Sequence, residues 1–165
     1  MRNIVFSVFV LLVSGCTSVP KNTENYAMLQ NSNIQLADGS HSLMFESVND
    51  KKLEVGAFTT PNQAAHYVSA GNVKLNAIVT YRTDKYRGVQ VADYAIDVSL
   101  EKSIEYFMEA SELNGCITMN FKNAKGELIA GPLTKPWYEY SSPERMLIRI
   151  GREEIIKRPK LCPES

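Results

Sequence analysis

The strongest constraint on the fold is an alternation of apolar and polar side chains that starts near Ile34 and recurs along most of the chain. It is clearest at residues 73–82, where the apolar positions are Val73, Leu75, Ala77, Val79 and Tyr81. Neighbouring residues of a strand point to opposite faces, so this pattern is typical of a strand with one face in a core and the other in water. We therefore expect a mainly β protein.

Turn residues separate at least seven short segments of this kind. Asn49-Asp50 lies between two segments, 42–46 and 52–57, which we expect to pair as a hairpin. A second hairpin loop runs from Asn123 to Gly126 and ends on a glycine suited to positive φ. Short strands joined by turns favour a single small antiparallel β-sandwich, or a partly open barrel, over a parallel sheet.

The last third of the chain is less regular, because prolines interrupt it. Residues 142–158 fit two structures: Ser142-Pro143-Glu144 could start a helix, whereas Met146, Ile148 and Ile150 alternate as in a strand. We favour the strand and leave the helix open.

Length and charge limit the number of domains and the class of partner. A chain of 165 residues is long enough for one domain with a hydrophobic core and too short for two ordinary ones. Its 18 basic and 18 acidic residues balance to a formal net charge of zero. No basic excess is present to attract nucleic acid, so we expect no nucleic-acid partner.

The N-terminus has the layout of a secretory signal. Met1-Arg2-Asn3 carries one positive charge, and residues 4–13 are apolar apart from Ser7. This run is shorter than the roughly 20 apolar residues that a membrane-spanning helix needs. We therefore do not expect a permanent transmembrane anchor.

The end of that run, Leu12-Val13-Ser14-Gly15-Cys16, closely resembles the lipobox of bacterial lipoproteins. The resemblance implies that residues 1–15 are a lipoprotein signal peptide, and that Cys16 becomes the N-terminus and carries diacylglycerol and an amide-linked acyl chain such as palmitate. Two acyl chains already anchor a protein stably. Thr17, in place of the aspartate that favours inner-membrane retention in such lipoproteins, implies the outer membrane.

The polar residues after Cys16 predict a flexible tether over 16–33, with a short helix around Tyr26–Gln30 as the alternative. The β-rich periplasmic domain is then expected over residues 34–165.

The remaining cysteines, Cys116 and Cys162, suit a disulfide in an oxidising compartment. Their bond would close a loop of 46 residues. The alternative is one buried and one exposed free thiol.

Little in the sequence points to an enzyme. His41 and His66 are the only histidines, and we expect both at the surface or in loops, so a multi-histidine metal site or a His-dependent triad has little material. Ser99 and Lys102 match the Ser-x-x-Lys spacing of penicillin-binding proteins, but in strand-like sequence and without the partner motifs. We predict no catalytic residue, no metal and no cofactor beyond the covalent lipid on Cys16.

Two aromatic stretches, 81–87 and 135–140, are candidate recognition surfaces. Aromatic and arginine side chains are enriched at binding hot spots. The candidate partner-binding patch consists of Trp137, Tyr138, Tyr140, Tyr86 and Arg87. The alternative, which we favour, is that Trp137 and one tyrosine fill the open end of the sandwich.

Together these features predict a non-enzymatic lipoprotein of the cell envelope, anchored in the outer membrane and facing the periplasm. It would act as an accessory or assembly factor that binds another envelope protein or component. The alternative is a ligand-binding module or hydrolase inhibitor that recognises peptidoglycan, glycan or a foreign enzyme. A hydrolase without a familiar motif is a third class.

Overall fold

The structure is a computed structural model that describes residues 23–37, 39–54, 61–83, 88–113 and 115–140. These ranges contain two single-turn 3-10 helices, η1 (Thr23–Asn25) and η2 (Pro61–Gln63), together with the strands of two sheets. The strands are β1 (Tyr26–Gln30), β2 (Ser32–Leu36), β3 (Gly39–Val48), β4 (Lys51–Lys52), β5 (Ala65–Ser69), β6 (Gly71–Thr83), β7 (Val89–Leu100), β8 (Glu105–Leu113), β9 (Cys116–Asn123), β10 (Leu128–Pro136) and β11 (Tyr138–Tyr140).

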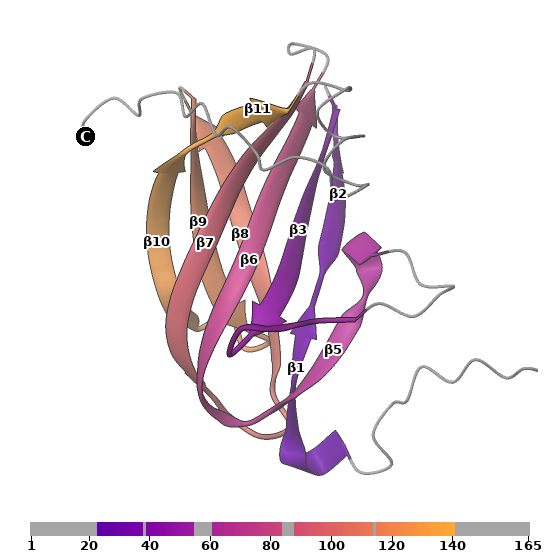
Figure 1. Cartoon of the computed structure of the whole chain (residues 1–165), viewed down its shortest axis with the longest axis vertical. Helices are drawn as coiled ribbons and strands as arrows, with labels where there is room; N and C mark the ends of the chain where they lie inside the picture. Colours follow the sequence, from indigo (N-terminus) through magenta and orange to yellow (C-terminus); the bar gives the residue numbers. More distant parts are fainter. Residues whose placement is uncertain (1–22, 38, 55–60, 84–87, 114, 141–165) are drawn as a thin grey trace, which may run out of the picture.

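The two sheets pack face to face as the layers of a β-sandwich (Figure 1). The first sheet has the strand order β10-β9-β8-β1-β5 and the second has the order β11-β7-β6-β3-β2, with β4 paired to β3. The predicted mainly β sandwich is confirmed, and the sheets do not close into a barrel. Among the described strands the pairing is antiparallel except between β1 and β8, which run parallel.

The core lies where the predicted alternation places it. In β6 every second residue from Val73 to Tyr81 is buried, and in β7 the same holds from Tyr94 to Leu100. The first sheet contributes a facing layer that includes Tyr106, Met119 and Phe121. The period-two pattern of the sequence is therefore the inward face of each sheet.

The two predicted hairpin loops are present. Asn49 and Asp50 turn β3 into β4 with φ of 49° and 62°, values that short polar residues tolerate best. Gly126 follows β9 with φ of 82°, where a side chain would be strained. The return strand after Asp50 is Lys51–Lys52, shorter than expected, and residues 55–57 lie outside the described residues.

The folded domain begins earlier than predicted. Residues 26–30 and 32–33 belong to strands, so the expectation of a flexible tether up to residue 33 is wrong, and so is the alternative helix over Tyr26–Gln30. The reason is that Ala27 and Leu29, both fully buried, fill the core while Tyr26, Met28 and Gln30 are only part-buried. Residues 16–22 lie outside the described residues.

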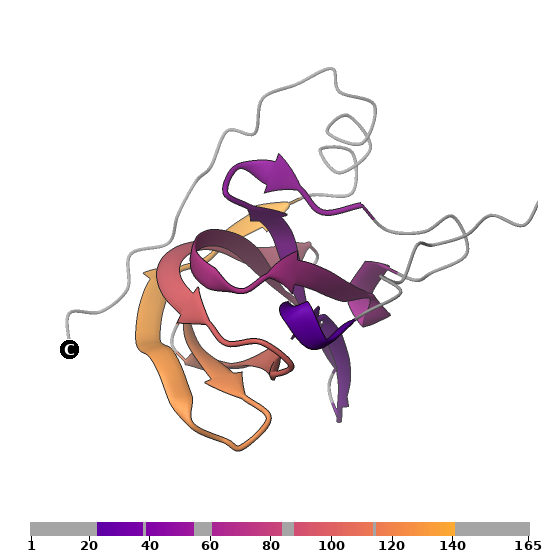
Figure 2. The same cartoon turned by 90° about the horizontal axis from the view of Figure 1, so that it is seen from below.

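Asn31 lies where the chain crosses from the first sheet, at the end of β1, to the second sheet, at the start of β2. Its side chain is 3% exposed. The Oδ1 atom accepts the Phe45 N–H at 2.8 Å, and Nδ2 donates to the Pro61 carbonyl at 2.7 Å and to His66 Nε2 at 3.3 Å. One amide therefore ties both sheets and the η2 turn together. Figure 2 shows the sandwich from below, the end at which η1 lies.

Replacing Asn31 with alanine is expected to destabilise the domain by about 3 kcal/mol, because it leaves the Phe45 N–H and the Pro61 carbonyl without their partner. Chemical denaturation of the two proteins measures this difference. Asn33→Ala is the matched control, since Asn33 is only part-buried and accepts one bond, from Ser42 Oγ at 3.1 Å. Equal losses in the two variants would contradict the role given to Asn31.

Candidate functional site

The inward-facing residues become polar at one end of the sandwich. Across the second sheet, from β2 to β11, one register row contains Ile34, His41, Tyr81, Gln90 and Glu139. The corresponding row of the first sheet contains Glu112, Ile117 and Lys135. We call the four residues His41, Tyr81, Gln90 and Glu112 the polar end. It lies at the top of Figure 1, beside β11, whereas η1 and the start of β1 lie at the bottom.

His41 continues the core row of β3, two residues before Leu43. It is 6% exposed, and neither ring nitrogen has a hydrogen-bond partner. Its ring packs edge-on against Tyr81 at a centroid distance of 4.9 Å. The expectation that both histidines lie at the surface or in loops is therefore wrong: His66 is also buried, in β5, because an imidazole ring that lies on the inward side of a strand packs as core.

The other residues of the polar end are hydrogen-bonding groups in apolar surroundings. Burial and the negative charge of Glu112 raise the pKa of Tyr81 to about 12, so its hydroxyl stays protonated at neutral pH. Gln90 is 1% exposed; its Nε2 donates to the Gly88 carbonyl at 3.1 Å, while Oε1 has no partner. Buried polar atoms without partners are costly, and a ligand that supplied the partners would be favoured.

Alternation alone could have located this end. His41 is two residues before the apolar run Leu43–Phe45, Gln90 is two before Ala92, and Glu112 follows Met108 at an even spacing. Each is a polar residue at an inward position. This signal was present in the sequence, although our sequence analysis did not single out Gln90 or Glu112.

Stability is expected to fall as the pH falls, because burial lowers the pKa of both His41 and His66 below the ordinary 6.5. The unfolded chain then binds protons that the folded protein resists. The two neutral histidines contribute this stability fully above about pH 6.5. It is lost as the pH falls from there toward their lower pKa values in the folded protein. Protonation of His66 would also break a hydrogen bond directly. Its Nε2 accepts from Asn31 Nδ2, and a proton on Nε2 would place two donors face to face.

Thermal unfolding between about pH 7.5 and about pH 5 measures this dependence. His41→Phe and His66→Gln, which keep a ring or an acceptor, are each expected to reduce the slope. A midpoint that stayed constant in the native protein over this range would contradict the prediction.

The two aromatic residues of the predicted partner-binding patch whose side chains the structure describes are not at the surface. Trp137 is 1% exposed and Tyr138 is 5% exposed, and the Tyr138 hydroxyl donates to Asp93 Oδ1 at 2.9 Å. Trp137 is part of the core between the sheets, as the alternative had it, because its apolar area is worth more in the core than in water. Tyr138 is buried on the other face of the second sheet, where it pairs with Val91, so it does not fill the sandwich. Tyr86 and Arg87 lie outside the described residues, as does the side chain of Tyr140.

The two aromatic stretches nevertheless belong to the same end of the molecule. The connection between β6 and β7 leaves at Thr83 and returns at Gly88, and the Gly88 N–H donates to Glu139 Oε1 at 2.7 Å. The structure thus brings together segments about 50 residues apart in the sequence, in the manner typical of non-local β pairing.

Of the cysteines, only Cys116 lies within the described residues. It is 7% exposed, starts β9 near the polar end, and is not a free thiol. Cys16 and Cys162 lie outside the described residues, so the pairing of Cys116 with Cys162 stays a prediction.

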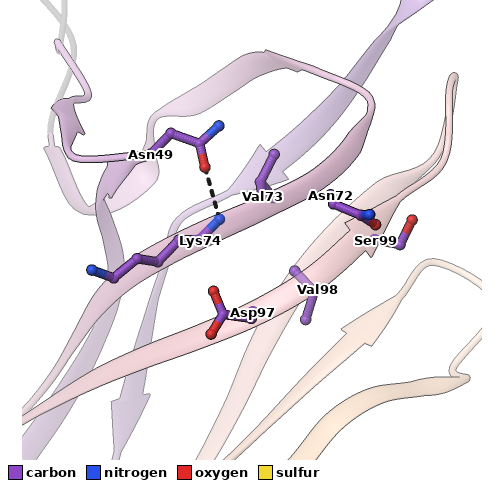
Figure 3. A pocket seen from close by; sticks show the side chains of 7 residues that line it. All are labelled: Asn49, Asn72, Val73, Lys74, Asp97, Val98 and Ser99. Atoms are coloured by element: carbon purple, nitrogen blue, oxygen red, sulfur yellow. Dashed lines mark hydrogen bonds between the residues drawn. The ribbon is translucent and has the colours of Figure 1, made fainter.

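A second feature is an open depression of about 550 Å³ along β6 and β7 (Figure 3). It lies where Asn72 pairs with Ser99, at the opposite end of these strands from Tyr81 and Gln90. Its lining residues are Asn49, Asn72, Val73, Lys74, Asp97, Val98 and Ser99. The Lys74 N–H donates to Asn49 Oδ1 at 2.9 Å, and Lys74 Nζ lies 3.5 Å from Asp50 Oδ1. The depression therefore offers amide, hydroxyl and carboxylate groups to solvent.

The described part of the chain contains no group of three or more His, Cys, Asp or Glu side chains that could hold a metal ion. Within the same residues, no helix is long and apolar enough to cross a membrane. No protein-family model, no curated protein and no solved structure matches the chain. The fold and the site thus define a small β-sandwich with a polar end, and a fold of this class does not by itself imply a function.

Proposed function

We propose that this chain is an outer-membrane lipoprotein that faces the periplasm, is anchored by lipid on Cys16, and binds another envelope component without catalysing a reaction. The lipobox-like Leu12–Cys16 supports the anchor. The polar end supports binding, because it holds buried hydrogen-bonding groups without partners and the part-buried Glu112 carboxylate.

The observation that carries this proposal is the position of the polar end relative to the N-terminus of the described domain. η1 begins at Thr23, seven residues after Cys16, and lies at one end of the sandwich, whereas the polar end lies at the other (Figure 1). A domain attached to lipid through its N-terminal end would direct the polar end away from the membrane. A partner in the periplasm could then reach it.

Cys16→Ser is expected to convert the protein from membrane-bound to unprocessed or released, because it removes the only proposed site of acylation. Membrane fractionation and the intact mass measure this. Thr17→Asp is the matched control: it keeps lipidation and is expected to move the protein to the inner membrane. A Cys16→Ser protein that remained processed and equally membrane-bound would exclude the lipoprotein.

The binding function is tested by photo-crosslinking in intact cells from two exposed leucines. Leu113 is 71% exposed at the polar end, and Leu128 is 51% exposed at the opposite end, where it pairs with Lys122. We expect a crosslinked envelope protein, identified by mass spectrometry, from position 113 and not from position 128. Equal capture at both positions, or none at either, would contradict binding at the polar end.

The depression along β6 and β7 favours a second candidate function, a module that binds a polar ligand such as a peptidoglycan fragment. Asn72, Asp97 and Ser99 expose groups of the kind that hydrogen-bond sugars. Binding of soluble muropeptides that Asp97→Asn weakens and Glu112→Gln leaves unchanged would favour this candidate over the first.

A further inference from the structure

The first sheet lacks a strand beside the second half of β8. β1 pairs with β8 only from Met28 opposite Glu105 to Gln30 opposite Phe107. At Asn31 the chain then crosses to the second sheet, while β8 continues to Leu113. Among the described residues, the segment from Met108 to Leu113 is paired by β9 alone and is an open edge on its other side.

The backbone groups directed to that open side can be assigned from the bonds that β1 and β9 make. The Ile104 carbonyl accepts the Met28 N–H at 3.0 Å, whereas the Glu105 carbonyl accepts the Ala124 N–H, on the β9 side, at 2.9 Å. Successive residues of a strand alternate in direction. The N–H and C=O groups of Met108, Ala110 and Glu112 therefore point to the open side, which makes this edge a template for another strand.

The missing strand also leaves part of the inward face of the second sheet uncovered. We call the space beside Met108–Leu113 where that strand would lie the vacancy. Ile34 pairs with His41 and so faces inward, yet it is 42% exposed, because no described strand of the first sheet covers it. Leu113, at the end of the open edge, is 71% exposed. Of these residues and Leu128, the large hydrophobic residues that are exposed in the described part of the chain, Ile34 alone faces inward at the vacancy, because Leu113 has the outward orientation of Glu109 in β8.

The charge at the vacancy is negative. Glu112 points inward, its Oε1 accepts the Gly115 N–H at 3.0 Å, and it forms no ion pair with any described residue. Glu109, on the same strand, points outward and is paired with Lys122 at 2.6 Å. A residue placed opposite Glu112 on an added strand would also face inward, so a lysine or arginine there would be favoured.

We propose that the edge from Met108 to Leu113 accepts an extended segment of a partner protein as an additional strand of the first sheet. The segment carries a basic side chain opposite Glu112 and an apolar side chain over Ile34. Main-chain bonds to the edge supply affinity, and the alternate inward side chains supply specificity. This rests on the proposed binding function and specifies how the partner is held.

The test uses the mature lipidated protein in detergent micelles and two capped nine-residue peptides of alternating threonine and valine. One peptide has a central lysine and its twin a central glutamate. We expect the lysine peptide to bind at least about tenfold more tightly, as measured by calorimetry. Glu112→Lys is expected to reverse this order, and Glu109→Lys, which changes the outward charge of the same strand, to leave it unchanged.

Ala110→Pro provides a second test, because it removes an N–H from the open edge and none from the ladder with β9. It is expected to weaken the lysine peptide by about tenfold or more, while amide exchange of β9 stays protected. Three outcomes would overturn the proposal. Neither peptide binds, Glu109→Lys and Glu112→Lys have equal effects, or the protein forms a homodimer that Ala110→Pro dissociates.

The two proposals fail separately. Absence of peptide binding together with crosslinking from Leu113 in cells would overturn strand addition and leave the binding function standing. Peptide binding without any crosslinked envelope protein would overturn the proposed binding function in cells and leave strand addition standing.

Discussion

Replacing Phe121 with alanine is expected to lower the free energy of unfolding by about 4 kcal/mol, the cost typical of a large aromatic ring removed from a packed core. Phe121 is fully buried in β9. It stacks on Tyr106 of the same sheet at 5.4 Å and meets Phe45 of the opposite sheet edge-on at 5.8 Å. Its loss therefore leaves a cavity between the two layers.

Denaturant titration with a constant slope would measure this difference. Leu128→Ala is the matched control: the side chain is 51% exposed, so the change is expected to stay within about 0.5 kcal/mol. A Phe121→Ala domain as stable as the control would mean that the contact between the layers lies elsewhere.

Breaking the proposed bond between Cys116 and Cys162 is expected to cost a similar amount, about 4 kcal/mol for a loop of this length. The gain comes from the unfolded chain, which loses conformations when the 46-residue loop is closed. Cys162→Ala is the better variant, because Cys116 is buried and its truncation would also remove core volume.

The bond itself is checked by mass. Reduction is expected to add the mass of two hydrogen atoms to the native protein and none to Cys162→Ala. Peptide mapping under non-reducing conditions should then join the fragments that contain Cys116 and Cys162. Free thiols at both positions in protein from the periplasm would exclude the pairing.

The fold class was predictable because strand periodicity is a local property. Val73–Tyr81 and Tyr94–Leu100 alternate regardless of which strands pair with them, so their inward faces could be assigned from the sequence. The N-terminal boundary was not predictable in this way. In β1 only Ala27 and Leu29 are buried, and the apolar Met28 between them hides the alternation, so the signal is too weak to separate a strand from a tether.

The histidines were misplaced for a related reason. Histidine is intermediate in its preference for burial, so its residue type alone does not place it in the core. The position of His41 in the register of β3, two residues before Leu43, places it there. Trp137 is a similar case: its side chain type suited both a binding patch and a core, and burial in the sandwich decided between them.

By itself the sequence determined the lipobox-like segment before Cys16, the mainly β class, the inward rows and the two hairpin turns, because each depends on residues that are close together in the chain. Only the tertiary structure decided that β1 leaves the first sheet at Asn31 and that β8 keeps an open edge beside the polar end. Those features arise from pairings between residues 77 positions apart, such as Leu29 with Tyr106, and no local pattern records which strands will meet.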